Sequence, residues 1–101
     1  MSDIVYQTVD TSTPAIASDT TALAANTARI GFSIQNLGTN PLFVRLGSGA
    51  STSLFHYVLK AGTGNDDGIG GILSMMEGVI YTGIITIAGT SPRYTTLEIA
   101  P

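Results

Sequence analysis

The chain has 101 residues, which is the size of a single domain with a hydrophobic core of its own. Only 11% of its residues are Asp, Glu, Lys or Arg, against about 25% in ordinary soluble domains. The 4 basic residues are scattered, so we expect no nucleic-acid partner. There is no cysteine, which excludes disulfides and thiolate metal sites. The longest apolar stretch is about half of the ~20 residues that a membrane helix needs, so we expect no membrane partner.

Residues 1–27 are rich in Thr, Ser and Ala, with Pro14 in the middle. The segment 4–9, IVYQTV, is typical of a short strand, and most of the remainder predicts an extended arm. Such an arm is either a free terminus or a segment that lies on a neighbouring subunit. We therefore divide the chain into an extended N-terminal arm over 1–27 and a single β-sandwich domain over 28–101.

From residue 28 onward, apolar residues alternate with small or polar ones. Residues 28–36 (ARIGFSIQN) and 42–47 (LFVRLG) both show the period of two that half-buried strands have. The intervening LGTN predicts a turn, so the two strands form a β-hairpin. The side chains expected to face the core are Ile30, Phe32 and Ile34 in the first strand and Leu42, Val44 and Leu46 in the second.

The segment 54–60, LFHYVLK, is the next predicted strand, and it is apolar on both faces. Its Phe55, Tyr57 and Leu59 are expected in the core, which turns the alternate residues outward. An outward apolar surface suits contact with another subunit, because a monomer would expose it to water. The candidate interface residues are Phe43, Arg45, Leu54, His56 and Val58.

Further strands are predicted at about 72–76, 79–88 and 93–99. The chain therefore contains roughly seven short strands with regular turn signals and no helical periodicity. This pattern predicts an all-β fold, namely an antiparallel β-sandwich or jelly-roll-like barrel with an extended N-terminal arm.

The Gly-rich loop 62–71 contains the candidate contact residues Asn65, Asp66 and Asp67. We interpret it as a turn whose side chains cap their own backbone. Calcium binding and contact with a partner are alternatives, although the loop lacks the glutamate that ends an EF-hand.

The chain contains a single histidine, His56, whereas a zinc site normally needs several His or Cys ligands. A Ser-His-Asp set could be written with His56, but no G-x-S-x-G motif positions a nucleophile. We therefore predict no catalytic, cofactor-binding or metal-binding residue, no cofactor, and no enzymatic activity.

Three motifs resemble small structural proteins encoded by tailed bacteriophages: QNLGTNPLFVRLGSGAST at 35–52, NDDGIGG at 65–71 and GTSPRYTTLEI at 89–99, with Arg29 before the first strand. The resemblance covers about residues 22–99 and is greatest to capsid decoration, or cement, proteins. It implies a homotrimer made in the host cytoplasm and located on the capsid surface of the virion. Its partner would be the major capsid protein or another virion protein. The alternatives are a tail, collar or fibre-knob component, or a host-surface carbohydrate-binding module, which aromatic side chains exposed in loops would favour.

Overall fold

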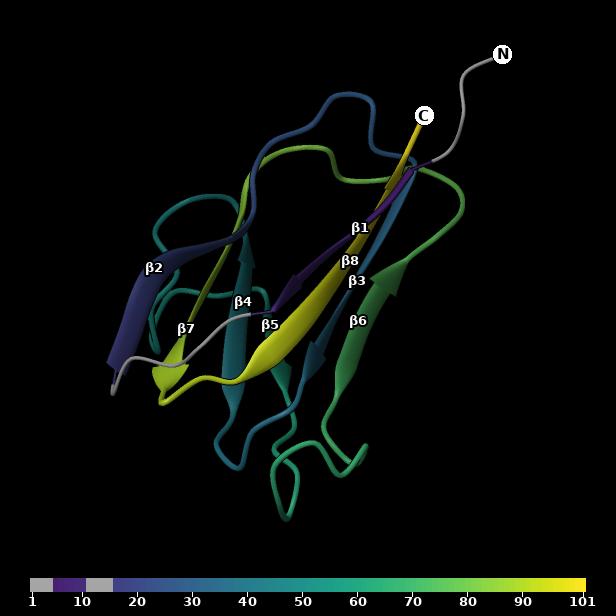
Figure 1. The fold of residues 1–101 in the computed structure, drawn as a ribbon. Helices are drawn as coiled ribbons and strands as arrows, with labels where there is room; N and C mark the ends of the chain where they lie inside the picture. The colour runs from purple at the N-terminus through teal and green to yellow at the C-terminus, as the bar shows by residue number, and fades with distance from the viewer. Residues whose placement is uncertain (1–4, 11–15) are drawn as a thin grey trace.

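The computed structural model describes residues 5–10 and 16–101, and Figure 1 shows that they form two sheets packed face to face. The strand order is β1-β8-β3-β6 in one sheet and β2-β7-β4-β5 in the other. Within these residues, no helix is long and apolar enough to cross a membrane. The strands are β1 (Val5–Asp10), β2 (Ile16–Leu23), β3 (Gly31–Asn36), β4 (Leu42–Leu46), β5 (Tyr57–Leu59), β6 (Ile72–Met75), β7 (Ile85–Thr90) and β8 (Tyr94–Ala100).

The strand pairing has a simple order along the chain. The first four strands pair with the last four in reverse, so that β1 meets β8, β2 meets β7, β3 meets β6 and β4 meets β5, all antiparallel. Successive pairs alternate between the two sheets. A long hairpin wound up in this way is a jelly roll. The predicted all-β sandwich or jelly-roll-like barrel is therefore confirmed.

The segment predicted to be an N-terminal arm supplies an edge strand to each sheet. β1 lies beside β8, where the sequence predicted a strand over 4–9. β2 lies beside β7 with two register shifts, and Asp19 within it has a φ of +50°. Such irregular pairing explains why this Thr- and Ala-rich stretch shows no alternation. Residues 1–4 and 11–15, the rest of the predicted arm apart from the link to β3, lie outside the described residues.

The core lies between the two sheets and contains the inward faces of the predicted hairpin. Phe32, Ile34, Leu42 and Val44 are fully buried, as predicted. Ile30 was predicted to join them, but its side chain is 45% exposed because it precedes the first residue of β3. The other buried apolar residues of the core cluster are Ala22, Leu23, Leu59, Leu73, Ile85, Ile87 and Tyr94.

Two strand predictions need correction. β5 covers only Tyr57–Leu59 of the predicted strand 54–60, so Phe55 and Tyr57 are 38% and 39% exposed and do not lie in the core. Leu59 is buried, as predicted. β7 starts at Ile85 and not at residue 79, because 79–84 is an irregular segment. Its Ile80 and Tyr81 pack against the core from a loop, and an apolar run of this kind cannot be distinguished from a strand by hydropathy.

A buried arginine joins three parts of the chain at one end of the sandwich. The Nε atom of Arg29 donates to Glu98 Oε1 on β8 at 2.8 Å. Its Nη1 donates to the carbonyls of Tyr81 (2.9 Å) and Gly83 (3.1 Å) in the β6–β7 loop. Its Nη2 donates to the carbonyl of Ala24, after β2, at 2.7 Å. All three nitrogens of the guanidinium are therefore engaged in holding the fold together.

Candidate interaction surface

The outer face of β4 and β5 contains the residues that the sequence singled out as an interface. Phe43 lies on the side of β4 opposite the buried Leu42 and Val44. Val58 of β5 is directly opposite Phe43 in the strand pair, so the two share this outer face. The ring of Phe55 packs on that of Phe43, with centroids 5.1 Å apart and planes inclined at 58°.

The loop that follows β4 folds over the same face and is fixed there by hydrogen bonds. Ala50 is buried, and its carbonyl accepts the N–H of Asp19 on β2 at 2.7 Å. Its N–H donates to Thr86 Oγ1 on β7 at 3.2 Å, and that hydroxyl donates to the carbonyl of Gly47 at 2.6 Å. The N–H of Gly49 donates to Asp19 Oδ1 at 2.6 Å. These bonds attach the loop to two strands, so the surface that it carries is preorganised.

The side chain of His56 is held by the backbone of β4. The backbone N–H of His56 donates to the carbonyl of Val44 at 2.8 Å, and the ring Nδ1 accepts a hydrogen bond from the N–H of Leu46 at 2.9 Å. Because Nδ1 accepts, the hydrogen of the neutral ring lies on Nε2. His56 is exposed and therefore presents a donor to the surroundings. This geometry makes it a residue that can orient a contact.

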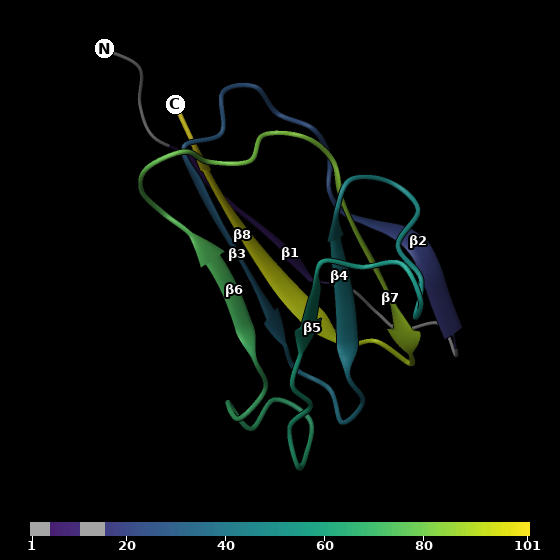
Figure 2. The ribbon, with the colours of Figure 1, turned by 180° about the vertical axis from the view of Figure 1, so that it is seen from behind.

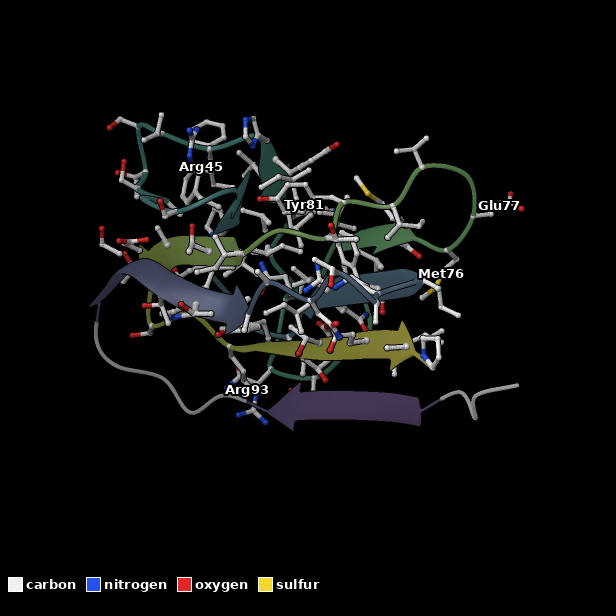
Figure 3. The ribbon with its side chains drawn as sticks, turned by 90° about the horizontal axis from the view of Figure 1, so that it is seen from above. Arg45, Met76, Glu77, Tyr81 and Arg93 are labelled. Carbon is white, nitrogen blue, oxygen red and sulfur yellow. The ribbon has the colours of Figure 1, made fainter. Side chains whose placement is uncertain are left out.

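We call the surface formed by Phe43, Leu54, Phe55 and Val58 the β5 patch. Leu54, Phe55 and Val58 are 46%, 38% and 49% exposed. Arg45 and His56 border the patch, and Figure 3 shows Arg45 on the side of the molecule away from β8 and β1. Of the five predicted interface residues, Phe43, Arg45 and Val58 lie on this outer face, with Phe43 and Arg45 half-buried. Leu54 and His56 are exposed in the segment that leads into β5.

Sequence reasoning missed Phe55 because it placed that residue in a strand. The bridge between Ser51 and Leu54 closes a tight turn, which shifts the start of β5 to Tyr57. The signal for this turn is the Ser-Thr-Ser run at 51–53, since such residues favour turns over strands.

The second predicted contact element, the Gly-rich loop, is held by its own aspartates. Asp66 forms a two-bond ion pair with Arg93, at 2.8 and 2.6 Å, and Arg93 holds the pKa of that carboxyl below its ordinary 3.8. Asp67 accepts hydrogen bonds from the N–H groups of Ile69 and Gly64 and from the hydroxyl and N–H of Thr63, and these bonds lower its pKa to about 2. The capping predicted for this loop is therefore present at Asp67.

Asn65 lies exposed beside these aspartates, at the surface of the loop. In the part of the chain that is described, no three His, Asp or Glu side chains gather where they could hold a metal ion. Comparison of the chain with protein-family models, curated proteins and solved structures finds no match. The chemistry that the surface offers is thus apolar contact and ring stacking at the β5 patch, with polar donors at its border.

Proposed function

We propose that this chain is a non-enzymatic virion structural protein that binds the outer surface of a phage capsid and stabilises it, as a decoration or cement protein. The observation that carries the proposal is the β5 patch, an apolar surface held rigidly on a charge-poor jelly roll. The resemblance of 35–52, 65–71 and 89–99 to phage structural proteins supports it. The role requires no cofactor.

The physical reason to expect assembly is that the patch is costly when it faces water. Three neighbouring residues of the patch, Leu54, Phe55 and Val58, each leave more than a third of their surface exposed. Contact with a further subunit or with the shell would remove this apolar area from water, at roughly 25 cal/mol for each Å² buried. In the proposal, a homotrimer forms through the β5 patch and binds the major capsid protein or another virion protein.

The fixed loops favour the same interpretation. Asp66 with Arg93, and Asp67 with its N–H and hydroxyl donors, make the hydrogen bonds that order the Gly-rich loop. A loop that is already ordered loses little entropy when it touches a partner. We therefore propose Asn65, Asp66 and Asp67 as a contact with the shell.

Mass spectrometry of purified virions tests the location. Hundreds of copies per particle are expected for a capsid decoration protein, whereas a number of the order of ten would indicate a tail or collar with its low cyclic symmetry. Absence from the virion would overturn the proposal.

A deletion experiment then tests the role. Virions without the protein should assemble but release DNA at a lower temperature, and addition of the purified protein should restore the resistance. Particles that are equally robust without it but fail to attach to cells would indicate a tail or adhesion role instead.

A host-surface carbohydrate-binding module remains a second candidate, and one observation favours it. Phe55 is an aromatic side chain exposed in a loop, next to the Nε2 donor of His56. An exposed ring with nearby donors can stack on a sugar and bond its hydroxyls. Binding to a glycan panel that is lost in Phe55→Ala, and kept in Ile72→Ala, would support this function over the capsid role.

A further inference from the structure

β6 is a sheet edge of only 4 residues, but it has no bulge, charge or proline to protect it against pairing with another chain. Edge strands expose unpaired backbone groups, and proteins commonly protect them with bulges, charges, prolines or short length. Among the three edge strands with described side chains, β2 has two register shifts and β5 has only 3 residues. β6 pairs with β3 in unbroken register and contains neither a charge nor a proline. Figure 2 shows it as the outermost strand of its sheet.

The hydrogen-bond pattern shows which residues of β6 could pair outward. The N–H of Asn36 donates to the carbonyl of Gly71 at 3.0 Å, which is one of the two bonds of a hydrogen-bonded facing pair; the N–H of Gly71 donates instead to the carbonyl of Lys60 at 2.9 Å. The register continues with Ile34 opposite Leu73 and Phe32 opposite Met75. By alternation, Leu73 and Met75 direct their backbone groups to β3. Ile72 and Ser74 direct theirs to the free edge.

The apolar residues around β6 occur in nearly the same order whether the segment is read forward or backward. In residues 69–79, IGGILSMMEGV, the apolar residues lie symmetrically about Ser74. Ile72 corresponds to Met76, Leu73 to Met75, and Ile69 to Val79. Within this segment, Ile69, Ile72, Met76 and Val79 are 48%, 60%, 43% and 98% exposed. Figure 3 shows Met76 at the margin of the molecule, with Glu77 pointing away from it.

We propose that two copies of this chain pair antiparallel through β6, with Ser74 of one copy opposite Ser74 of the other across a two-fold axis. In this register Ile72 faces Met76 of the second copy and Leu73 faces Met75. The two four-stranded sheets then become one continuous sheet of eight strands. The inference goes beyond the proposed function and does not depend on it.

The occupant is a second copy, because antiparallel self-pairing brings the symmetrically placed apolar residues of the segment opposite one another. Glu77 falls opposite Gly71 of the second copy, so no like charges meet at the contact. A register centred on Leu73 would place Ile72 opposite Ser74, and one centred on Met75 would place Leu73 opposite Glu77. Pairing about Ser74 matches apolar residues with apolar residues, and the two hydroxyls meet on the axis.

Disulfide trapping tests the register directly, because the chain contains no cysteine of its own. Facing residues in a hydrogen-bonded antiparallel pair have Cα atoms about 5.5 Å apart, which is within the range of a disulfide. Ser74→Cys should therefore give a covalent dimer under mild oxidation. The matched control is Ser33→Cys, which lies opposite Ser74 on the inner neighbour β3 and should not be trapped.

A charge on the axis tests the same contact without a covalent bond. Ser74→Lys places two like charges opposite each other and should weaken the dimer at least about tenfold in sedimentation equilibrium, whereas Ser33→Lys should leave it unchanged. Equal trapping of Ser74→Cys and Ser33→Cys, or association unaffected by Ser74→Lys, would overturn the inference and leave the proposed function standing. If Ser74→Cys is trapped as a dimer but purified virions lack the protein, the inference stands and the proposed function is overturned.

Discussion

At the residue scale, the buried side chain of Arg29 makes four hydrogen bonds, to partners that no local sequence pattern reveals. Arg29 and Glu98 are 69 positions apart and form an ion pair whose side chains are 0% and 8% exposed. Burial of two charges is tolerated only when further hydrogen bonds satisfy them, and three backbone carbonyls do so here. The sequence shows Arg29 before a strand, but its partners become apparent only once the strands are wound together.

Loss of either partner of this pair should destabilise the protein strongly. Glu98→Ala leaves the Arg29 guanidinium buried without its carboxylate and should lower the free energy of unfolding by about 3–5 kcal/mol. Arg29→Lys should also destabilise the protein, because one ammonium group cannot replace a planar guanidinium that donates to four acceptors. Urea denaturation measures both changes. Arg45→Ala, which removes an exposed bond to Ser48, is the control and should change stability by less than about 1 kcal/mol. An equal loss in Arg45→Ala and Glu98→Ala would contradict the prediction.

Acid should loosen the Gly-rich loop through Asp67. The hydrogen bonds that Asp67 accepts from the N–H groups of Ile69 and Gly64 and from the hydroxyl and N–H of Thr63 lower its pKa from 3.8 to about 2 in the folded protein. Because the folded pKa lies below the unfolded one, the carboxylate contributes its stabilisation above about pH 4, and this contribution is lost as the pH falls toward 2. Urea midpoints measured across this range should fall, and should fall less steeply in Asp67→Asn. The same slope in both proteins would show that other groups cause the acid effect.

At the element scale, the alternation of apolar and polar residues predicted the strands that have one solvent-exposed and one buried face. The same pattern failed to predict the start of β5, where the chain folds back on the outer face of β4. β3 begins three residues after the predicted start and ends where predicted, and β4 ends one residue early; Phe32, Ile34, Leu42 and Val44 are all buried. The start of β5 was wrong because Phe55 covers Phe43 on the outer face and does not enter the core. A local sequence pattern cannot predict such a contact, because it assigns every apolar residue of a strand to the core.

In the connection between β5 and β6, the tightest glycine position is Gly70. A Cβ on Gly70 would overlap the carbonyl oxygen of Asn36, which is backbone and cannot move aside. Gly70→Ala should therefore lower the melting temperature by several degrees, or prevent folding, since overpacking costs about 1–3 kcal/mol or more. Gly64→Ala, in the same loop, meets no atom within 4 Å and should leave stability unchanged or slightly raised. Equal melting temperatures of the two variants would contradict this account.

At the scale of the whole molecule, the pairing of early strands with late ones leaves two surfaces of different symmetry. β1 to β4 find their partners among β5 to β8, and the winding places β6 at one edge of one sheet and the β5 patch on the outer face of the other. The apolar patch is assigned to the trimer of the proposed function, whereas a self-complementary edge suits a two-fold axis. Because the two contacts use different residues, each can be removed without the other.

The trimer of the proposed function can therefore be tested separately from the β6 dimer. Phe43→Asp should leave the β-sheet signal in circular dichroism intact, because the ring lies on the outer face of β4. It should abolish the trimer in light scattering, since burial of a Phe side chain contributes roughly 1.5–3 kcal/mol per subunit and a carboxylate opposes it. Phe32→Asp is the control and should unfold the chain, because Phe32 is fully buried.

The double variant Phe43→Asp with Ser74→Lys tests whether the β5 patch and the β6 edge associate independently. If the two contacts are independent, Phe43→Asp alone leaves dimers, Ser74→Lys alone leaves trimers, and the double variant is a monomer at micromolar concentration. A folded Phe43→Asp protein with unchanged mass would show that the β5 patch does not join subunits. Its exposed apolar surface would then have to be covered by a different molecule, such as the shell.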